Sequence, residues 1–121
     1  MLESSTDSLG PPLDLVHLAR QCLGDHALEA ELLQLFRLQA PALAAQLSGP
    51  PFLALALKAK IAHTLRGSAL AIGARRVASA ALRVEELASA AGDQASEAAL
   101  AVAALRSAVA EALVEIDRIR G

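Results

Sequence analysis

One histidine of the chain, His63, stands among residues that could support chemistry at its ring. Arg66 follows it by three positions and Lys60 precedes it by three, so on a helix both cations flank the imidazole. Gly67 lies one helical turn further on, although glycine costs about 1 kcal/mol relative to alanine inside a helix. An imidazole is a nucleophile at neutral pH. We therefore expect His63 to accept a phosphoryl group on a ring nitrogen, with Arg66 and Lys60 offsetting its charge and Gly67 leaving the ring accessible.

A carboxylate further along the chain is expected to orient this imidazole. Gly73 predicts a turn that folds the chain back into an antiparallel pair of helices. His63 lies ten residues before this glycine and Glu85 twelve after it, so the two side chains should lie at similar height. Glu85 would then accept a hydrogen bond from Nδ1–H of His63, which fixes the tautomer and leaves Nε2 free to attack phosphorus.

The helix that carries His63 is predicted over residues 52–72, and its periodicity places the histidine away from the core. At about 100° per residue, one side forms a predicted core stripe of Leu57, Ile61, Leu65, Ser68 and Ile72. The opposite side carries Ala56, Ala59, Lys60, His63, Arg66, Gly67 and Leu70. We therefore expect His63 to be exposed, with Ala56, Ala59 and Leu70 around it as a docking patch for a partner.

Four other helices are predicted from apolar periodicity and end signals. Asp14 caps a short helix over residues 15–23 that Gly24 ends, and Asp25 caps a longer one over 26–47. Pro41 should kink or split this second helix. The last two helices are predicted over residues 75–91 and from a cap at Asp93 to about residue 120.

Composition agrees with an all-α domain. Hydrophobic residues make up 55% of the 121 residues, mostly alanine and leucine, whereas aromatic residues make up 2%. We expect residues 1–12 to be a flexible leader. Residues 13–121 are expected to form an antiparallel up-and-down four-helix bundle with an additional short N-terminal helix.

The same composition argues against several functions. A net charge of −2 and scarce aromatics do not suit nucleic-acid binding. The apolar runs, such as residues 52–57, are too short to cross a membrane. Cys22 is the single cysteine, which excludes an internal disulfide and fits a cytoplasmic protein. We expect it to act as a small hydrophobic residue rather than as a nucleophile. Together with the scattered His17 and His26 it makes a metal site improbable.

The run Ala62-His63-Thr64-Leu65-Arg66-Gly67-Ser68-Ala69, followed by Ile72-Gly73-Ala74, resembles the signature of the histidine-containing phosphotransfer (HPt) domain. The resemblance covers about residues 13–120. It implies that His63 is the phospho-acceptor, Arg66 the basic residue and Gly67 the small residue that gives access. Glu85 stands where the family often places Gln or Glu. Arg66 departs from the more usual Lys, which keeps the charge but changes its shape.

The resemblance also implies partners. Response-regulator receiver domains and a hybrid or sensor histidine kinase would exchange phosphoryl groups with this chain, while the receiver binds the divalent metal. The chain itself would need no cofactor and no small-molecule substrate. It lacks a G-x-x-x-x-G-K-[ST] loop for ATP, so a phosphocarrier is favoured over a kinase. Arg75 and Arg76 form a pair of the kind that caps a hairpin turn, and we expect them also to help meet an acidic receiver surface. Two alternatives stay open, namely a non-catalytic adaptor for receiver or kinase domains and a structural bundle that dimerises.

Overall fold

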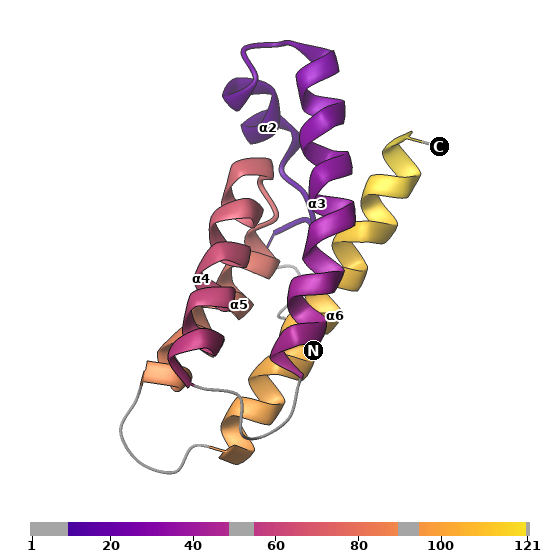
Figure 1. Cartoon of the computed structure of the whole chain (residues 1–121). Helices are drawn as coiled ribbons and strands as arrows, with labels where there is room; N and C mark the ends of the chain where they lie inside the picture. The colour runs from indigo at the N-terminus through magenta and orange to yellow at the C-terminus, as the bar shows by residue number, and fades with distance from the viewer. Residues whose placement is uncertain (1–9, 49–54, 90–94, 121) are drawn as a thin grey trace.

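The computed structural model describes residues 10–48, 55–89 and 95–120, and all regular secondary structure in these ranges is α-helical. Figure 1 shows them as a bundle of helices. The helices are α2 (Leu15–Gln21), α3 (His26–Leu47), α4 (Leu55–Ile72), α5 (Arg75–Ser89) and α6 (Ala95–Arg120). The all-α class predicted from composition is therefore confirmed.

The long helices enclose one apolar core. Helix α4 packs against α3 and α5, α6 packs against the same two helices, and the short α2 lies against α3 and α4 (Figure 1). The largest fully buried side chains come from four of the five helices, and they are Leu18, Leu65, Ile72, Val77, Leu105 and Ile116. No polar or charged residue is buried among the described residues, so removal of apolar surface from water is the main stabilising term.

The helix starts follow the predicted caps. The side chain of Asp14 accepts a hydrogen bond from the backbone N–H of His17 at 3.0 Å. Asp25 accepts one from Leu28 at 3.1 Å. Each bond satisfies one of the N–H groups that a first helical turn leaves without a backbone partner.

Helix α2 ends at Gln21, two residues before the predicted end at Leu23. Leu23 has a φ of 52° and Gly24 one of 79°, so both residues leave the right-handed helical region. The backbone N–H of Gly24 reaches the carbonyl of Ala19 at 3.0 Å, and that of Leu23 reaches Arg20 at 3.2 Å. This is a Schellman ending, in which the left-handed turn begins at the leucine rather than at the predicted glycine.

Pro41 does not split α3. The helix runs unbroken from His26 to Leu47 with the proline inside it. Pro41 is exposed, so water can solvate the carbonyl that lacks an N–H partner one turn earlier. Buried side chains on both sides of it, Phe36 and Ala44 among them, keep the two halves packed on the same core.

The predicted turn at Gly73 joins α4 to α5. Gly73 has a φ of 76°, and the N–H of Ala74 reaches the carbonyl of Ala69 at 2.8 Å. The carbonyl of Gly73 itself accepts a hydrogen bond from the backbone N–H of Asp14 at 2.9 Å. The turn therefore fixes the register of α4 and α5, and it also binds Asp14, the N-cap residue of α2.

Some sequence predictions fall on residues that the structure does not describe. These are the start of the third predicted helix at 52–54, the helix end and cap at 90–93, and residues 1–9 of the leader. The remaining leader residues, 10–12, are described, and the carbonyl of Gly10 accepts a hydrogen bond from Nε of Arg76 at 2.8 Å.

Within the described ranges, no helix has the length and apolar character needed to cross a bilayer.

Candidate functional site

The buried side of α4 differs from the predicted stripe at two positions. Its buried residues are Ile61, Ala62, Leu65, Ala69 and Ile72. Leu57, predicted to be in the core, is 44% exposed, and that prediction is wrong. Ser68 is only half-buried. The alanines explain the difference, because small side chains let α5 approach closely and draw the centre of the buried face toward them. Leu57 then lies about 90° from that centre at 3.6 residues per turn.

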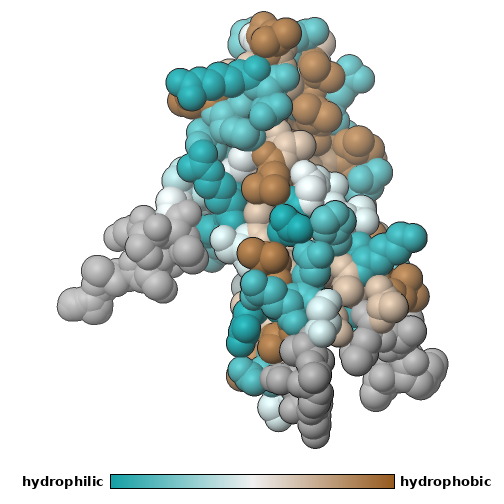
Figure 2. Space-filling model, turned by 90° about the vertical axis from the view of Figure 1, so that its left-hand side faces the viewer, coloured by the Kyte–Doolittle hydropathy of each residue, from teal (hydrophilic) through white to brown (hydrophobic). Residues whose placement is uncertain are grey.

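His63 lies on the side of α4 opposite this buried face. Its side chain is 64% exposed, as the periodicity predicted. Figure 2 views the side of the molecule on which α4 lies, where hydrophilic side chains alternate with small hydrophobic patches. The ring of His63 is therefore open to a partner that approaches α4.

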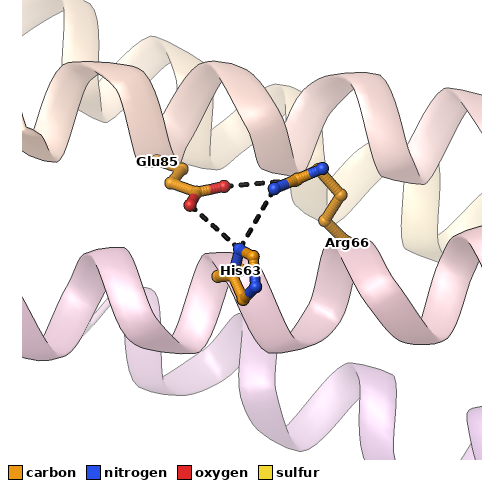
Figure 3. A network of polar contacts seen from close by, with 3 residues as sticks. All are labelled: His63, Arg66 and Glu85. Carbon is orange, nitrogen blue, oxygen red and sulfur yellow. Dashed lines mark hydrogen bonds and ion pairs between the residues drawn. The ribbon is translucent and has the colours of Figure 1, made fainter.

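The side chains of His63, Arg66 and Glu85 form a closed triangle of polar contacts (Figure 3). Nδ1 of His63 lies 3.0 Å from Oε2 of Glu85, so the contact predicted from the hairpin register is present. Nε of Arg66 donates to the other carboxylate oxygen, Oε1, at 3.1 Å. Nη2 of Arg66 lies 3.0 Å from Nδ1 of His63. Nε2 of His63 has no hydrogen-bond partner among the residues that the structure describes, and Figure 3 shows it directed away from the carboxylate.

The two contacts at Nδ1 require opposite proton positions. A neutral imidazole carries one N–H, so Nδ1 either donates to Glu85 or accepts from Arg66. With the proton on Nδ1, the ring donates to Glu85 and the lone pair of Nε2 faces outward. With the proton on Nε2, Nδ1 accepts from Arg66 and its lone pair also faces a carboxylate oxygen, which is repulsive. The first tautomer therefore suits nucleophilic attack by Nε2.

Packing between α4 and α5 holds the two charged partners in place. The side chain of Arg66 is 29% exposed and that of Glu85 is 24% exposed, so both are more shielded than the ring they contact. Arg66 follows His63 by three residues and lies on the side of α4 that turns toward α5. The sequence assigned it only to the phosphoryl oxygens. Its bond to Glu85 was missed, because no local pattern pairs residues 19 positions apart.

The other residues predicted on the His63 side differ in accessibility. Lys60, one turn before the histidine, is exposed and forms no hydrogen bond or ion pair with any residue in the described ranges. Ala56 and Leu70 are exposed, whereas Ala59 is half-buried. Ala56 and Leu70, of the three apolar residues predicted to contact a partner, are therefore accessible.

Arg75 and Arg76 are engaged elsewhere. Nη2 of Arg75 lies 2.9 Å from Oδ2 of Asp14, although the arginine side chain stays largely exposed. Arg76 is only 12% exposed and binds Glu111 on α6 at 3.0 Å, in addition to the carbonyl of Gly10. Arg75 therefore contacts the cap residue that is bonded to the turn, whereas Arg76 joins α5 to α6 and to Gly10. None of these contacts brings Arg76 to His63.

Two further titratable groups lie near the turn end of α4. The backbone N–H of His17, and to a smaller extent the charge of Arg75, lowers the pKa of Asp14 below its ordinary value of 3.8. Nε2 of His17 lies 2.8 Å from the carbonyl of Leu70, so the imidazole caps the last turn of α4. No pattern in the sequence predicted this capping contact.

Cys22 packs in the core, and His26 lies on the surface. Cys22 is buried in the core, where burial raises the pKa of its thiol, with smaller contributions from the charges of Glu29 and Asp25. His26 is highly exposed and lies 3.6 Å from Glu29. In the described part of the chain, no three His, Cys, Asp or Glu residues are grouped to hold a metal ion.

Comparison with known proteins adds no family assignment. No family model matches the chain, and neither the search of curated proteins nor that of solved structures gave a significant match.

Proposed function

We propose that this chain is a histidine phosphotransfer protein of a two-component phosphorelay. It accepts a phosphoryl group from the aspartate of one receiver domain on Nε2 of His63 and passes it to the aspartate of another. The observation that carries the proposal is the state of the two ring nitrogens. Nδ1 contacts Glu85 and Arg66, whereas Nε2 of this largely exposed side chain has no partner in the described residues.

We propose that the four long helices form an antiparallel up-and-down bundle, with α2 as the additional N-terminal helix. Each long helix packs against two of the others, and the connections between consecutive helices are short, which supports this arrangement. Such a protein would be a cytoplasmic phosphocarrier without an ATP site, rather than an enzyme.

The transfer step uses the free electron pair of Nε2. Nε2 attacks the phosphorus of an aspartyl phosphate, an N–P bond forms, and the P–O bond breaks with its electrons going to the aspartate carboxylate. The reverse step on a second receiver returns the electron pair to Nε2. Positive charge from Lys60 would stabilise the phosphoryl oxygens, because catalysis of phosphoryl transfer is mainly positioning and electrostatics. The divalent metal would be bound by the receiver.

The exposed residues around His63 would contact the receiver. Ala56 and Leu70 supply apolar surface and Gly67 supplies access, since a Cβ built at this glycine would have open space around it. Arg75 begins α5 directly after the turn that ends α4. Its side chain stays largely exposed although it contacts Asp14, so it would add charge steering toward an acidic partner. A carrier must leave one partner for another, so we expect the interface to be modest in area and short-lived. A hybrid or sensor histidine kinase would supply the first phosphoryl group of the relay.

Transfer from phosphorylated receivers tests the proposal directly. A panel of receiver domains carrying labelled aspartyl phosphate is mixed with this chain, and we expect label that is acid-labile and alkali-stable on His63. His63→Gln should abolish labelling. His26→Gln is the matched control, because His26 is an exposed helical histidine outside the triangle, and it should label normally.

Two further measurements separate the proposal from its rivals. Incubation with labelled ATP and magnesium alone should leave the chain unlabelled, and labelling there would indicate an autokinase. A non-catalytic adaptor would bind receivers without accepting phosphoryl groups, and His63→Gln would leave its signalling output intact. Loss of that output in the variant, with binding retained, is the result expected of a carrier.

A further inference from the structure

Nδ1 of His63, the ring nitrogen that would not carry the phosphoryl group, contacts two partners of opposite charge at equal distance. Nδ1 of His63 lies 3.0 Å from a carboxylate oxygen of Glu85 and 3.0 Å from Nη2 of Arg66. The ring therefore meets an acceptor when Nδ1 is protonated and a charged donor when it is not. In either state Nδ1 has one favourable partner at 3.0 Å.

We propose that this arrangement controls how long His63 holds its phosphoryl group, with Arg66 as the residue that favours storage. This inference rests on the proposed function, because it concerns the same ring after Nε2 has been phosphorylated. In the storage state Nδ1 is unprotonated and accepts a hydrogen bond from Arg66, and the guanidinium, which also binds Glu85, offsets the repulsion between the Nδ1 lone pair and the carboxylate. In the release state Nδ1 carries a proton and donates it in a hydrogen bond to Glu85.

The chemistry of the leaving group connects the proton to release. When the N–P bond breaks, its electron pair returns to Nε2. If Nδ1 is protonated, the ring leaves as neutral imidazole. If Nδ1 is unprotonated, the ring must leave as an imidazolate anion, which is a far poorer leaving group. The proton lost from Nδ1 on storage goes to water and returns from water before release, so no other reactant is needed.

The contacts of Arg66 fit this positioning role better than a role at the phosphoryl oxygens. Its Nε is held by Oε1 of Glu85 at 3.1 Å, and its Nη2 is directed at Nδ1 rather than at the outward Nε2. A guanidinium presents several donors in a fixed planar fork, so one side chain can bind the carboxylate and the ring together. Lysine, with its single ammonium group, could not reproduce this fork geometry. The arginine in place of the more usual lysine of the resembled signature therefore has a structural consequence.

The first experiment observes the proton on the wild-type ring. Phosphoramidate, a small phosphoryl donor, is used to load His63 without any receiver, and ³¹P spectra show which nitrogen is modified. Nitrogen-15 spectra of the imidazole are recorded before and after loading near neutral pH. We expect Nδ1 to be protonated before loading and unprotonated after it. Nδ1 that stays protonated in the loaded protein would overturn the inference, and so would failure of phosphoramidate to load the ring.

The second experiment measures the half-life of the loaded protein after removal of phosphoramidate. Arg66→Met should shorten the half-life by about twofold to tenfold, the range that loss of one hydrogen bond of modest net strength produces. Glu85→Gln should lengthen it, because an amide does not stabilise the protonated Nδ1 as a carboxylate does. Arg83→Met is the control. This exposed arginine of α5 pairs with Glu97, and its loss removes the same charge without touching the ring.

The outcomes distinguish the inference from the proposed function. Equal shortening by Arg66→Met and Arg83→Met would reduce the effect to net charge and overturn the inference. Circular dichroism identifies any variant that fails to fold, and the wild-type nitrogen spectra decide the question without variants. If the half-lives change as expected but no receiver exchanges phosphoryl groups with His63, the ring chemistry stands and the relay function fails.

Discussion

A Cβ placed on Gly73 would lie 2.7 Å from the carbonyl oxygen of Asp14, so the turn after the His63 helix leaves no room for a side chain. Its φ of 76° also lies in the left-handed region, which disfavours other residues. The carbonyl of the same glycine accepts the backbone hydrogen bond from Asp14. The approach of α2 to the hairpin of α4 and α5 therefore depends on a glycine at this position.

Gly73→Ala should lower the free energy of unfolding by more than about 2 kcal/mol. About 1–2 kcal/mol comes from the left-handed backbone, and displacement of Asp14 adds to it. Urea unfolding followed by circular dichroism measures the change. Gly24→Ala is the matched control, because Gly24 has a φ of 79° but nothing lies within 4 Å of its added Cβ. Equal losses in the two variants would show that the close approach to Asp14 is absent.

The part of this arrangement that could be predicted from the sequence is the part that follows from local pattern. The caps at Asp14 and Asp25 are local signals, as is the Gly73 turn. The contact between His63 and Glu85 follows from counting residues along both arms of a hairpin whose turn is known. These predictions needed no knowledge of how far apart the helices lie.

The remaining features depend on distances between elements. The approach of Asp14 to Gly73 joins two predicted end signals that nothing in the sequence connects. Helical periodicity places Leu57 on the core stripe, but the alanines at 62 and 69 turn the buried face of α4 away from it. The bond between Arg66 and Glu85 likewise requires the rotation of α4 against α5, which residue spacing does not fix.

Replacing Asp14 by asparagine should make stability less dependent on acid pH. The pKa of Asp14 is lowered below 3.8 in the folded chain, mainly by the hydrogen bond from the N–H of His17. The charged carboxylate therefore stabilises the fold above pH 3.8, and this contribution is lost as pH falls through the lowered pKa. We expect wild type to exceed Asp14→Asn in free energy of unfolding at neutral pH, with the difference shrinking below pH 3.8. Urea unfolding at several pH values measures it.

Arg75 provides the control for this prediction. Its charge is a smaller cause of the lowered pKa than the backbone hydrogen bond. Most of the acid dependence should therefore survive in Arg75→Gln. An acid dependence that disappears in this variant would assign the effect to the ion pair instead.

Truncating two leucines of α4 should have very different effects. Leu65 is fully buried, and Leu65→Ala should lower the free energy of unfolding by about 2–5 kcal/mol through lost burial and the cavity left behind. Leu57 is 44% exposed, so Leu57→Ala should change it by no more than about 0.5 kcal/mol. Urea unfolding of both variants provides the comparison. A large loss for Leu57→Ala would restore the core stripe predicted from the sequence.

Cys22 should react slowly with iodoacetamide in the folded protein. The thiol is buried, and burial raises its pKa, so the reactive thiolate is both scarce and inaccessible. It is the single cysteine of the chain, so mass spectrometry of the modified protein reports this site alone. We expect the rate to rise steeply once urea unfolds the protein. Similar rates in the two states would place Cys22 outside the core.

Gly67 offers a test in which stability and transfer are expected to separate. Nothing lies within 4 Å of a Cβ built on it, so the fold does not require a glycine here. Gly67→Ala should therefore raise the free energy of unfolding by about 0.5–1 kcal/mol.

A larger side chain, as in Gly67→Leu, would cover the approach to His63 from the next turn. It should slow transfer from a receiver domain while phosphoramidate still loads the ring, because only the protein donor needs close access to the backbone. Ala104→Leu adds the same side chain to an exposed position of α6, a helix that does not pack against α4, and should leave both reactions unchanged. If Gly67→Leu slowed both donors equally, the leucine would be covering the imidazole itself rather than blocking the approach of a partner protein.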